Sequence, residues 1–189
     1  MNVQLKPYTL MFLLIVFQVK YTSGLTLSKG EIDLHCLCEV LDCKKYSIDK
    51  PVAILEDKQI IQKLFGLNDK WLNMFNIDSR LMTVCYESLD GDFLRFIVVY
   101  DYEYFCSDNE VKEAIIYHEL GHITHPVAEK EINHQAEIFC DQNAIFHGYV
   151  SGIRKVLFLL SKMAHSLNNP LLIEAAETRT KALEQFKAV

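Results

Sequence analysis

Apolar runs and helix-capping signals alternate along the first part of the chain. An S-x-x-E capping box, formed by Ser28 and Glu31, predicts a helix over 29–44. The apolar run PVAIL at 51–55 then predicts a short strand, and the segment 57–64 predicts a helix. This part of the chain therefore mixes helix and strand.

The middle of the chain has the pattern of a β-hairpin. Two runs rich in β-branched and aromatic residues, at 81–86 and 93–101, flank the dipeptide Asp90-Gly91. An Asp-Gly pair favours a tight turn between antiparallel strands. We further expect the strand at 93–101 to lie at an edge of the sheet, where it could pair with an extended peptide.

The second half of the chain predicts consecutive helices. Ser107 and Glu110 form a second capping box, and the helix that begins there should end at His125 because Pro126 follows. Three more helices are expected, at 129–147 with Gly148 after it, at 153–165, and from Asn169-Pro170 toward the C-terminus. Strands followed by helices in this order predict an α+β domain.

The N-terminal segment differs from the rest. Lys6 precedes the apolar run 8–17, and small or polar residues follow as far as Gly24. This arrangement predicts a secretory signal peptide over 1–24, and a run of about 10 apolar residues is short against the roughly 20 that span a bilayer. We expect an exported protein, secreted or periplasmic, with one domain at 25–189. The alternative is an uncleaved membrane anchor that holds the domain outside the cytoplasm.

Composition narrows the function classes. Half of the residues are hydrophobic, 23% are charged, and the net charge is −6 without any Lys/Arg-rich run, so we expect no nucleic-acid partner. All six cysteines lie after position 24. In an exported chain an even number favours disulfides, although buried thiols also fit. The cluster of His35, Cys36, Cys38 and Cys43 could instead be a second metal site, but its spacing matches no standard zinc pattern.

The strongest chemical signal is the run HELGH, residues 118–122. On a helix, His118 and His122 are four positions apart and share a face, so their imidazoles can hold one zinc ion. Glu119 stands between them in the sequence and can act as a general base. Uncharged residues surround the motif, as a zinc-binding helix in a packed core requires.

A catalytic zinc site needs a third protein ligand and an open position for water. The next predicted helix offers Glu137 as that ligand, with Asp141 four residues later on the same face. Asp141 can accept a hydrogen bond from the far nitrogen of a zinc-bound histidine. His125 and His134 stay open as alternative third ligands, whereas the metzincin pattern, which needs Gly at 125 and His at 128, is excluded.

HELGH with the downstream run EIFCD resembles the gluzincin metallopeptidases, in which H-E-x-x-H and E-x-x-x-D bind and orient zinc. Within that group it is most similar to the prenyl-protein-processing and heat-shock metalloproteases, whose E-x-x-A-D run has Ala where this chain has Cys140. It also resembles sensor-type metallopeptidases that read E-x-x-C-D. A fainter similarity, to a C-terminal E-R-I-x-x-L run, falls on Arg179. The resemblance implies a zincin-like fold: a small sheet, a zinc-binding helix, a glutamate helix and two C-terminal helices.

These residues together predict a Zn²⁺-dependent endopeptidase acting on a protein or peptide substrate. Glu119 would take the proton of the attacking water and pass it to the leaving amine. A donor to the oxyanion is also needed; His165 is our first candidate, with Tyr149 and Tyr117 as alternatives. Two rivals stand beside this hypothesis: a secreted binding module stapled by disulfides, and a zinc-binding but inactive pseudo-peptidase.

Overall fold

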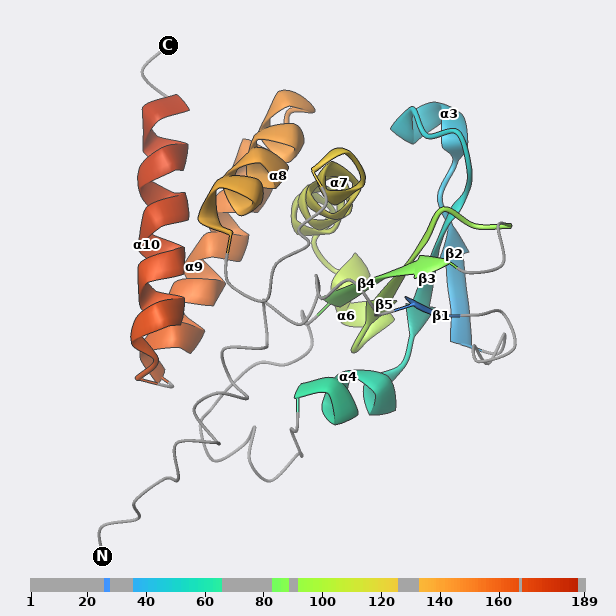
Figure 1. Ribbon diagram of the computed structural model, residues 1–189, viewed down its shortest axis with the longest axis horizontal. Coiled ribbons are helices and arrows are strands. Elements are labelled where there is room, and N and C mark those ends of the chain that lie inside the picture. The colour runs from blue at the N-terminus through green and yellow to red at the C-terminus, as the bar shows by residue number, and fades with distance from the viewer. Residues whose placement is uncertain are drawn as a thin grey trace, which may run out of the picture.

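A five-stranded sheet lies on one side of the molecule and the C-terminal helices lie on the other (Figure 1). The computed structural model describes residues 26–27, 36–65, 83–88, 92–125, 133–166 and 168–186. The strands occur in the order β1-β4-β5-β3-β2. Their bounds are β1 Thr26–Leu27, β2 Leu37–Val40, β3 Val52–Glu56, β4 Thr83–Ser88 and β5 Arg95–Val99.

The sheet is mixed, and its centre is apolar. β5 pairs antiparallel with β4 and parallel with β3, whereas β2 runs antiparallel to β3 on the far side. Val52 to Leu55 and Phe96 to Val99 are all buried, as expected for central strands covered on both faces. The strand expected at 51–55 and the antiparallel pair are therefore confirmed. The edge position expected for 93–101 is wrong, because β5 has a hydrogen-bonded partner on each side.

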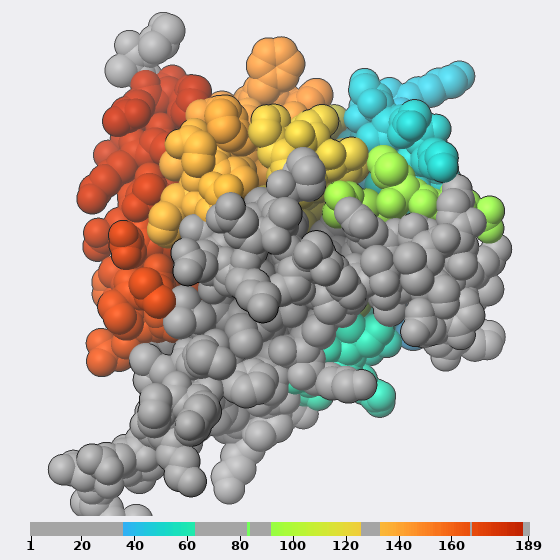
Figure 2. Space-filling model, viewed as in Figure 1, coloured from blue at the N-terminus to red at the C-terminus, as the bar shows by residue number. Residues whose placement is uncertain are grey.

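The helices are α3 (Cys43–Tyr46), α4 (Lys58–Phe65), α6 (Tyr102–Cys106), α7 (Asn109–Thr124), α8 (His134–Phe146), α9 (Val150–Ser166) and α10 (Pro170–Gln185). In Figure 1, α7 lies between the sheet and the outer helices, and it packs against both α8 and α9. Figure 2 shows α10, α8 and part of α7 side by side on one face of the molecule. The fold is α+β, as the order of elements predicts.

The helices from α7 to α10 lie close to where the sequence predicts them, and two turn signals explain their ends. Gly148 adopts a left-handed φ of 94° after α8, and the Asn169 side chain accepts hydrogen bonds from the backbone N–H groups of Leu171 and Leu172 at the start of α10. The capping residue of α7 is Asp108 rather than Ser107, because its carboxylate accepts from Glu110 N and Val111 N.

One predicted element is wrong. Of the helix expected at 29–44, residues 37–40 form strand β2, which pairs with β3 across an irregularity between Leu37 and Glu39. Pairing with the buried strand β3 outweighs the local helical preference. The capping box at Ser28 and Glu31 lies outside the described residues.

Three other expectations concern the N-terminus, the hairpin turn and the cysteines. The predicted signal peptide and the Asp90-Gly91 turn both lie outside the residues that the structure describes. Within the described part, no helix has the length and apolar character needed to cross a membrane. Four of the cysteines, Cys38, Cys43, Cys106 and Cys140, are thiols rather than disulfides.

Candidate metal centre

Helix α7 carries the H-E-x-x-H motif and is buried along most of its length. Val111 and every residue from Glu113 to His122 are buried, so the helix has no solvent-facing stripe there. The buried carboxylate of Glu113 is satisfied by Tyr46 Oη at 3.1 Å and by Lys45 Nζ at 2.7 Å. Burial of this kind holds the two histidines of the motif in fixed positions away from bulk water.

The two imidazoles meet at their Nε2 atoms. His118 Nε2 and His122 Nε2 are 3.2 Å apart, and the rings form an edge-to-face pair. Two nitrogen ligands of one tetrahedral zinc ion, at bond lengths of about 2.0–2.1 Å, lie roughly 3.3–3.4 Å apart. The spacing of the two nitrogens therefore fits shared binding of one ion.

Helix α8 comes close to α7 at Gly121. A Cβ atom at position 121 would lie only 2.9 Å from the Cα of Cys140, so a larger residue there would push the helices apart. Asn143 Nδ2 also donates to the carbonyl oxygen of Tyr117 at 2.6 Å. This close approach is what brings the acidic residues of α8 to the histidines of α7.

Glu137 and Asp141 both face the histidines, as their helical spacing predicts. Glu137 Oε2 lies 3.4 Å from His118 Nε2, and Oε1 of the same carboxylate lies 3.6 Å from His122 Nε2. Asp141 Oδ1 lies 2.9 Å from His118 Nδ1. Since a carboxylate can only accept, Nδ1 of His118 carries a proton, and Nε2 is left to face Glu137 and His122.

Arg179, on α10, contacts the acidic residues of the group that His118, His122, Glu137 and Asp141 form. Its Nε and one terminal nitrogen donate to the two oxygens of Asp141 at 2.8 and 2.6 Å, and its other terminal nitrogen donates to Glu137 Oε2 at 3.1 Å. The side chain is only 4% exposed. This is a buried two-pronged ion pair of the kind that favours arginine over lysine. The faint sequence similarity at Arg179 thus falls on a residue that contacts the group directly.

These contacts set the charges of the group. Burial raises the pKa of Glu137, but the hydrogen bond to His118 and the positive charge of Arg179 outweigh it and bring the pKa to about 2. In Asp141 burial is likewise outweighed, chiefly by Arg179, and the pKa is also about 2. Burial lowers the pKa of His118, whereas the two carboxylates raise it to about 9. A divalent ion would replace the proton that the carboxylates favour on Nε2.

Glu119 sits where helix α7 meets the sheet. Its side chain is 1% exposed, and Oε1 accepts a hydrogen bond from Thr83 Oγ1 of β4 at 3.3 Å. Its negative charge is also close enough to Cys140 to help raise the pKa of that thiol. Glu119, the predicted general base, is thus hydrogen-bonded to strand β4 and also lies close to Cys140.

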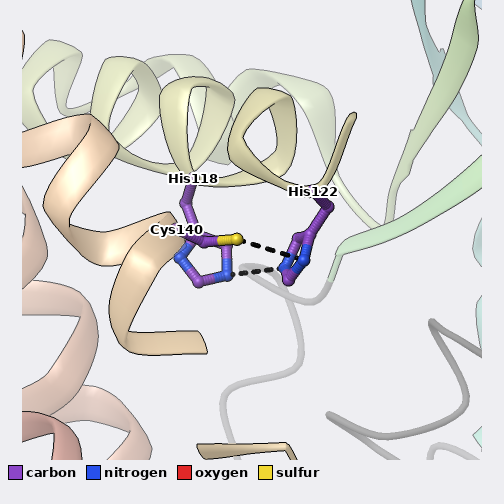
Figure 3. Close-up of side chains that lie close together, drawn as sticks. All are labelled: His118, His122 and Cys140. Carbon is purple, nitrogen blue, oxygen red and sulfur yellow. Dashed lines mark hydrogen bonds between the residues drawn. The ribbon is translucent and has the colours of Figure 1, made fainter. Parts of the chain in front are cut away.

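Cys140 completes a candidate metal-binding group that we did not expect from the sequence. Its Sγ lies 3.1 Å from His122 Nδ1, and one ligand atom from each of His118, His122 and Cys140 lie within 4.8 Å of one another (Figure 3). All three side chains are buried. The signal in the sequence was the position of Cys140, three residues after Glu137 on one helix face, where the similar metalloproteases have Ala.

The candidate donors to the oxyanion are His165, Tyr149 and Tyr117. His165 is exposed on α9, and its Nδ1 is 2.8 Å from the carbonyl oxygen of Ser161 on the same helix. Tyr117 stacks against His147 and Tyr149, with ring centroids 4.0 and 5.4 Å apart. No described contact joins these residues to the group, so the oxyanion donor stays a prediction.

The two alternative third ligands also make no described contact with the group. His125 is exposed at the end of α7 and stacks on Phe139 of α8, with ring centroids 4.8 Å apart. His134 is partly buried in the first turn of α8. Of the third ligands that the sequence offers, Glu137 is therefore the candidate whose carboxylate lies near both Nε2 atoms.

Comparison of the chain with models of known protein families, with curated proteins and with solved structures found no match. The residues of the group fit a divalent cation that accepts nitrogen, oxygen and sulfur ligands, which are the donors zinc prefers. The case for a function therefore depends on the geometry of these residues.

Proposed function

We propose that the protein is a zinc-dependent endopeptidase. The observation that carries the proposal is the meeting of three donors. The Nε2 atoms of His118 and His122 and the carboxylate of Glu137 lie 3.2, 3.4 and 3.6 Å from one another, close to the spacing of ligands around one tetrahedral zinc ion. Two histidines and one glutamate are the protein ligands of one established class of catalytic zinc site.

The surrounding residues would hold this ligand set in place. Asp141 accepts from Nδ1 of His118 and so directs the lone pair of Nε2 toward the ion. Arg179 binds Asp141 and Glu137 at once, which fixes both carboxylates and balances their negative charge. The group would then need only small side-chain shifts to bind the metal.

Glu119 would supply the acid–base chemistry. A zinc ion bound to the group would polarise the scissile carbonyl and lower the pKa of water. The Glu119 carboxylate would take a proton from that water and deliver it to the leaving amine. Thr83, which donates to Oε1 of Glu119, would orient the carboxylate. Burial of Glu119 keeps competing water away from the reaction.

The substrate class follows from the same hypothesis. A protein or peptide is the substrate of this chemistry in the gluzincin metallopeptidases that the motif resembles. We also propose that the protein acts outside the cytoplasm, on the basis of the predicted signal peptide at 1–24. N-terminal sequencing of exported protein tests this; a mature chain that begins at Met1 would leave the anchor as the alternative.

The decisive experiment compares the wild type with Glu119→Gln. We expect both proteins to bind one equivalent of zinc, and only the wild type to cleave a broad peptide library. Glu103→Gln, an exposed glutamate on α6, is the matched control and should keep both properties. Cleavage by zinc-loaded Glu119→Gln would remove Glu119 from the mechanism, and a wild type that binds no zinc would end the proposal.

The free thiols weaken the first rival function, the secreted binding module stapled by disulfides. A disulfide-stapled binding module would need paired cysteines, whereas Cys38, Cys43, Cys106 and Cys140 are thiols. The inactive zinc-binding protein has one observation in its favour, which is the buried sulfur beside His122.

A further inference from the structure

Two side chains of α8 approach His122 on different atoms. Glu137 lies near Nε2, whereas Cys140 Sγ lies 3.1 Å from Nδ1. In Figure 3 the sulfur and the His118 ring lie on the same side of the His122 ring, and both are directed at it. The chain therefore offers the two histidines a carboxylate and, on the Nδ1 side of His122, a sulfur as further donors.

The carboxylate and the sulfur differ in chemistry. A carboxylate leaves a zinc ion with an open fourth position, as catalysis requires. Adding a thiolate to two imidazoles and a carboxylate fills all four tetrahedral positions, and zinc sites that are closed in this way are structural. Sulfur also selects softer metal ions more strongly than oxygen does. A sulfur ligand would therefore change both the reactivity and the metal preference of the site.

The fold holds Cys140 in place for this role. Its side chain is 0% exposed and packs on Gly121, where an added Cβ would lie 3.1 Å from Sγ. An apolar residue such as the Ala of the similar metalloproteases would fill part of this space without offering a donor. The structure places a sulfur within 4.8 Å of both histidine ligand atoms instead.

We propose that Cys140 is a ligand in a resting form of the site, in which His122 binds through Nδ1 and the same ion is held by His118, Glu137 and Cys140, so that the position that the attacking water needs is filled. The thiol proton passes to solvent as the sulfur–metal bond forms, and it returns to sulfur when water displaces Cys140. This inference rests on the proposed zinc-dependent function, and it describes how that function is held back.

The experiment loads the full chain with one equivalent of Cd²⁺ or Co²⁺ and measures the near-ultraviolet charge-transfer absorption that a sulfur–metal bond produces. The variants are Cys140→Ser, which keeps the size of the side chain, and Cys38→Ser, an exposed thiol outside the group that serves as control. We expect the band in the wild type and in Cys38→Ser, and its complete loss in Cys140→Ser. We also expect zinc-loaded Cys140→Ser to cleave peptides faster than the wild type.

The outcomes separate the two hypotheses. Binding of one metal equivalent that depends on His118 but gives no sulfur band overturns the role of Cys140 and leaves the peptidase proposal standing. Absence of any metal binding overturns both. If Cys140→Ser does not fold, ¹¹³Cd NMR of the wild type decides instead, because the cadmium chemical shift distinguishes an ion with a sulfur ligand from an ion without one.

Discussion

Replacing Arg179 by Ala should destabilise the metal-free protein far more than the metal-bound protein. The guanidinium makes hydrogen bonds of 2.6 and 2.8 Å with Asp141 and of 3.1 Å with Glu137, and all three side chains are buried. Without Arg179, the two buried carboxylates would lose the cation that contacts both of them directly and would keep the histidines as partners. A bound zinc ion would supply the missing positive charge next to Glu137.

The magnitude follows from the burial. Removing one partner of a buried ion pair costs about 3–5 kcal/mol, because the other charge is left uncompensated. Since domains of this size unfold with about 5–15 kcal/mol, the metal-free variant should lose a large part of its free energy of unfolding. Arg179→Lys keeps the charge but loses the planar fork, so its cost should fall between those of the wild type and the Ala variant.

The assay is urea unfolding, run once with a chelator and once with saturating zinc. Arg154→Ala is the control, because this arginine is exposed on α9 and its loss should cost less than about 0.5 kcal/mol. The deficit of Arg179→Ala should shrink by more than half when zinc is present. A deficit of equal size in both conditions, or one no larger than that of Arg154→Ala, would refute the charge-balancing role.

Three further predictions concern the group. Glu137→Ala should weaken zinc binding in equilibrium dialysis more than Asp141→Ala does, because it removes a donor that faces both Nε2 atoms, whereas Asp141→Ala should weaken zinc binding by about 10–100-fold; equal affinities in the two variants would contradict their different roles. In urea unfolding the metal-free protein should lose stability between pH 6.5 and about 9, because the raised pKa of His118 stabilises the folded state below pH 6.5 and this contribution disappears as His118 deprotonates. A His118→Gln variant should not show this loss, and a wild-type pH profile that matches the profile of the variant would argue against a protonated His118. Gly121→Ala should destabilise the protein by about 1–3 kcal/mol and weaken zinc binding, because the new Cβ would meet the Cα of Cys140 at 2.9 Å; unchanged zinc affinity would show that the close approach of α7 and α8 does not position the ligands.

The sequence predicts the local features of this protein well. The histidines of HELGH share a face because four residues make about one helical turn, and no tertiary contact is needed for that inference. The ends of α8 and α10 follow from Gly148 and Asn169, whose preferences are set by their own backbone and side-chain chemistry. The same spacing rule put Glu137 and Asp141 on one face of the next helix.

Features that depend on distant segments required the tertiary structure. Residues 37–40 form a strand because the buried strand β3 pairs with them, and β5 is central because β3 joins it from the side opposite its antiparallel partner β4. Arg179 reaches Asp141 from 38 positions away in the sequence. Cys140 becomes part of the group because Gly121 lets α8 pack closely on α7. Helical spacing orders residues within one turn, whereas packing between elements decides which turns meet.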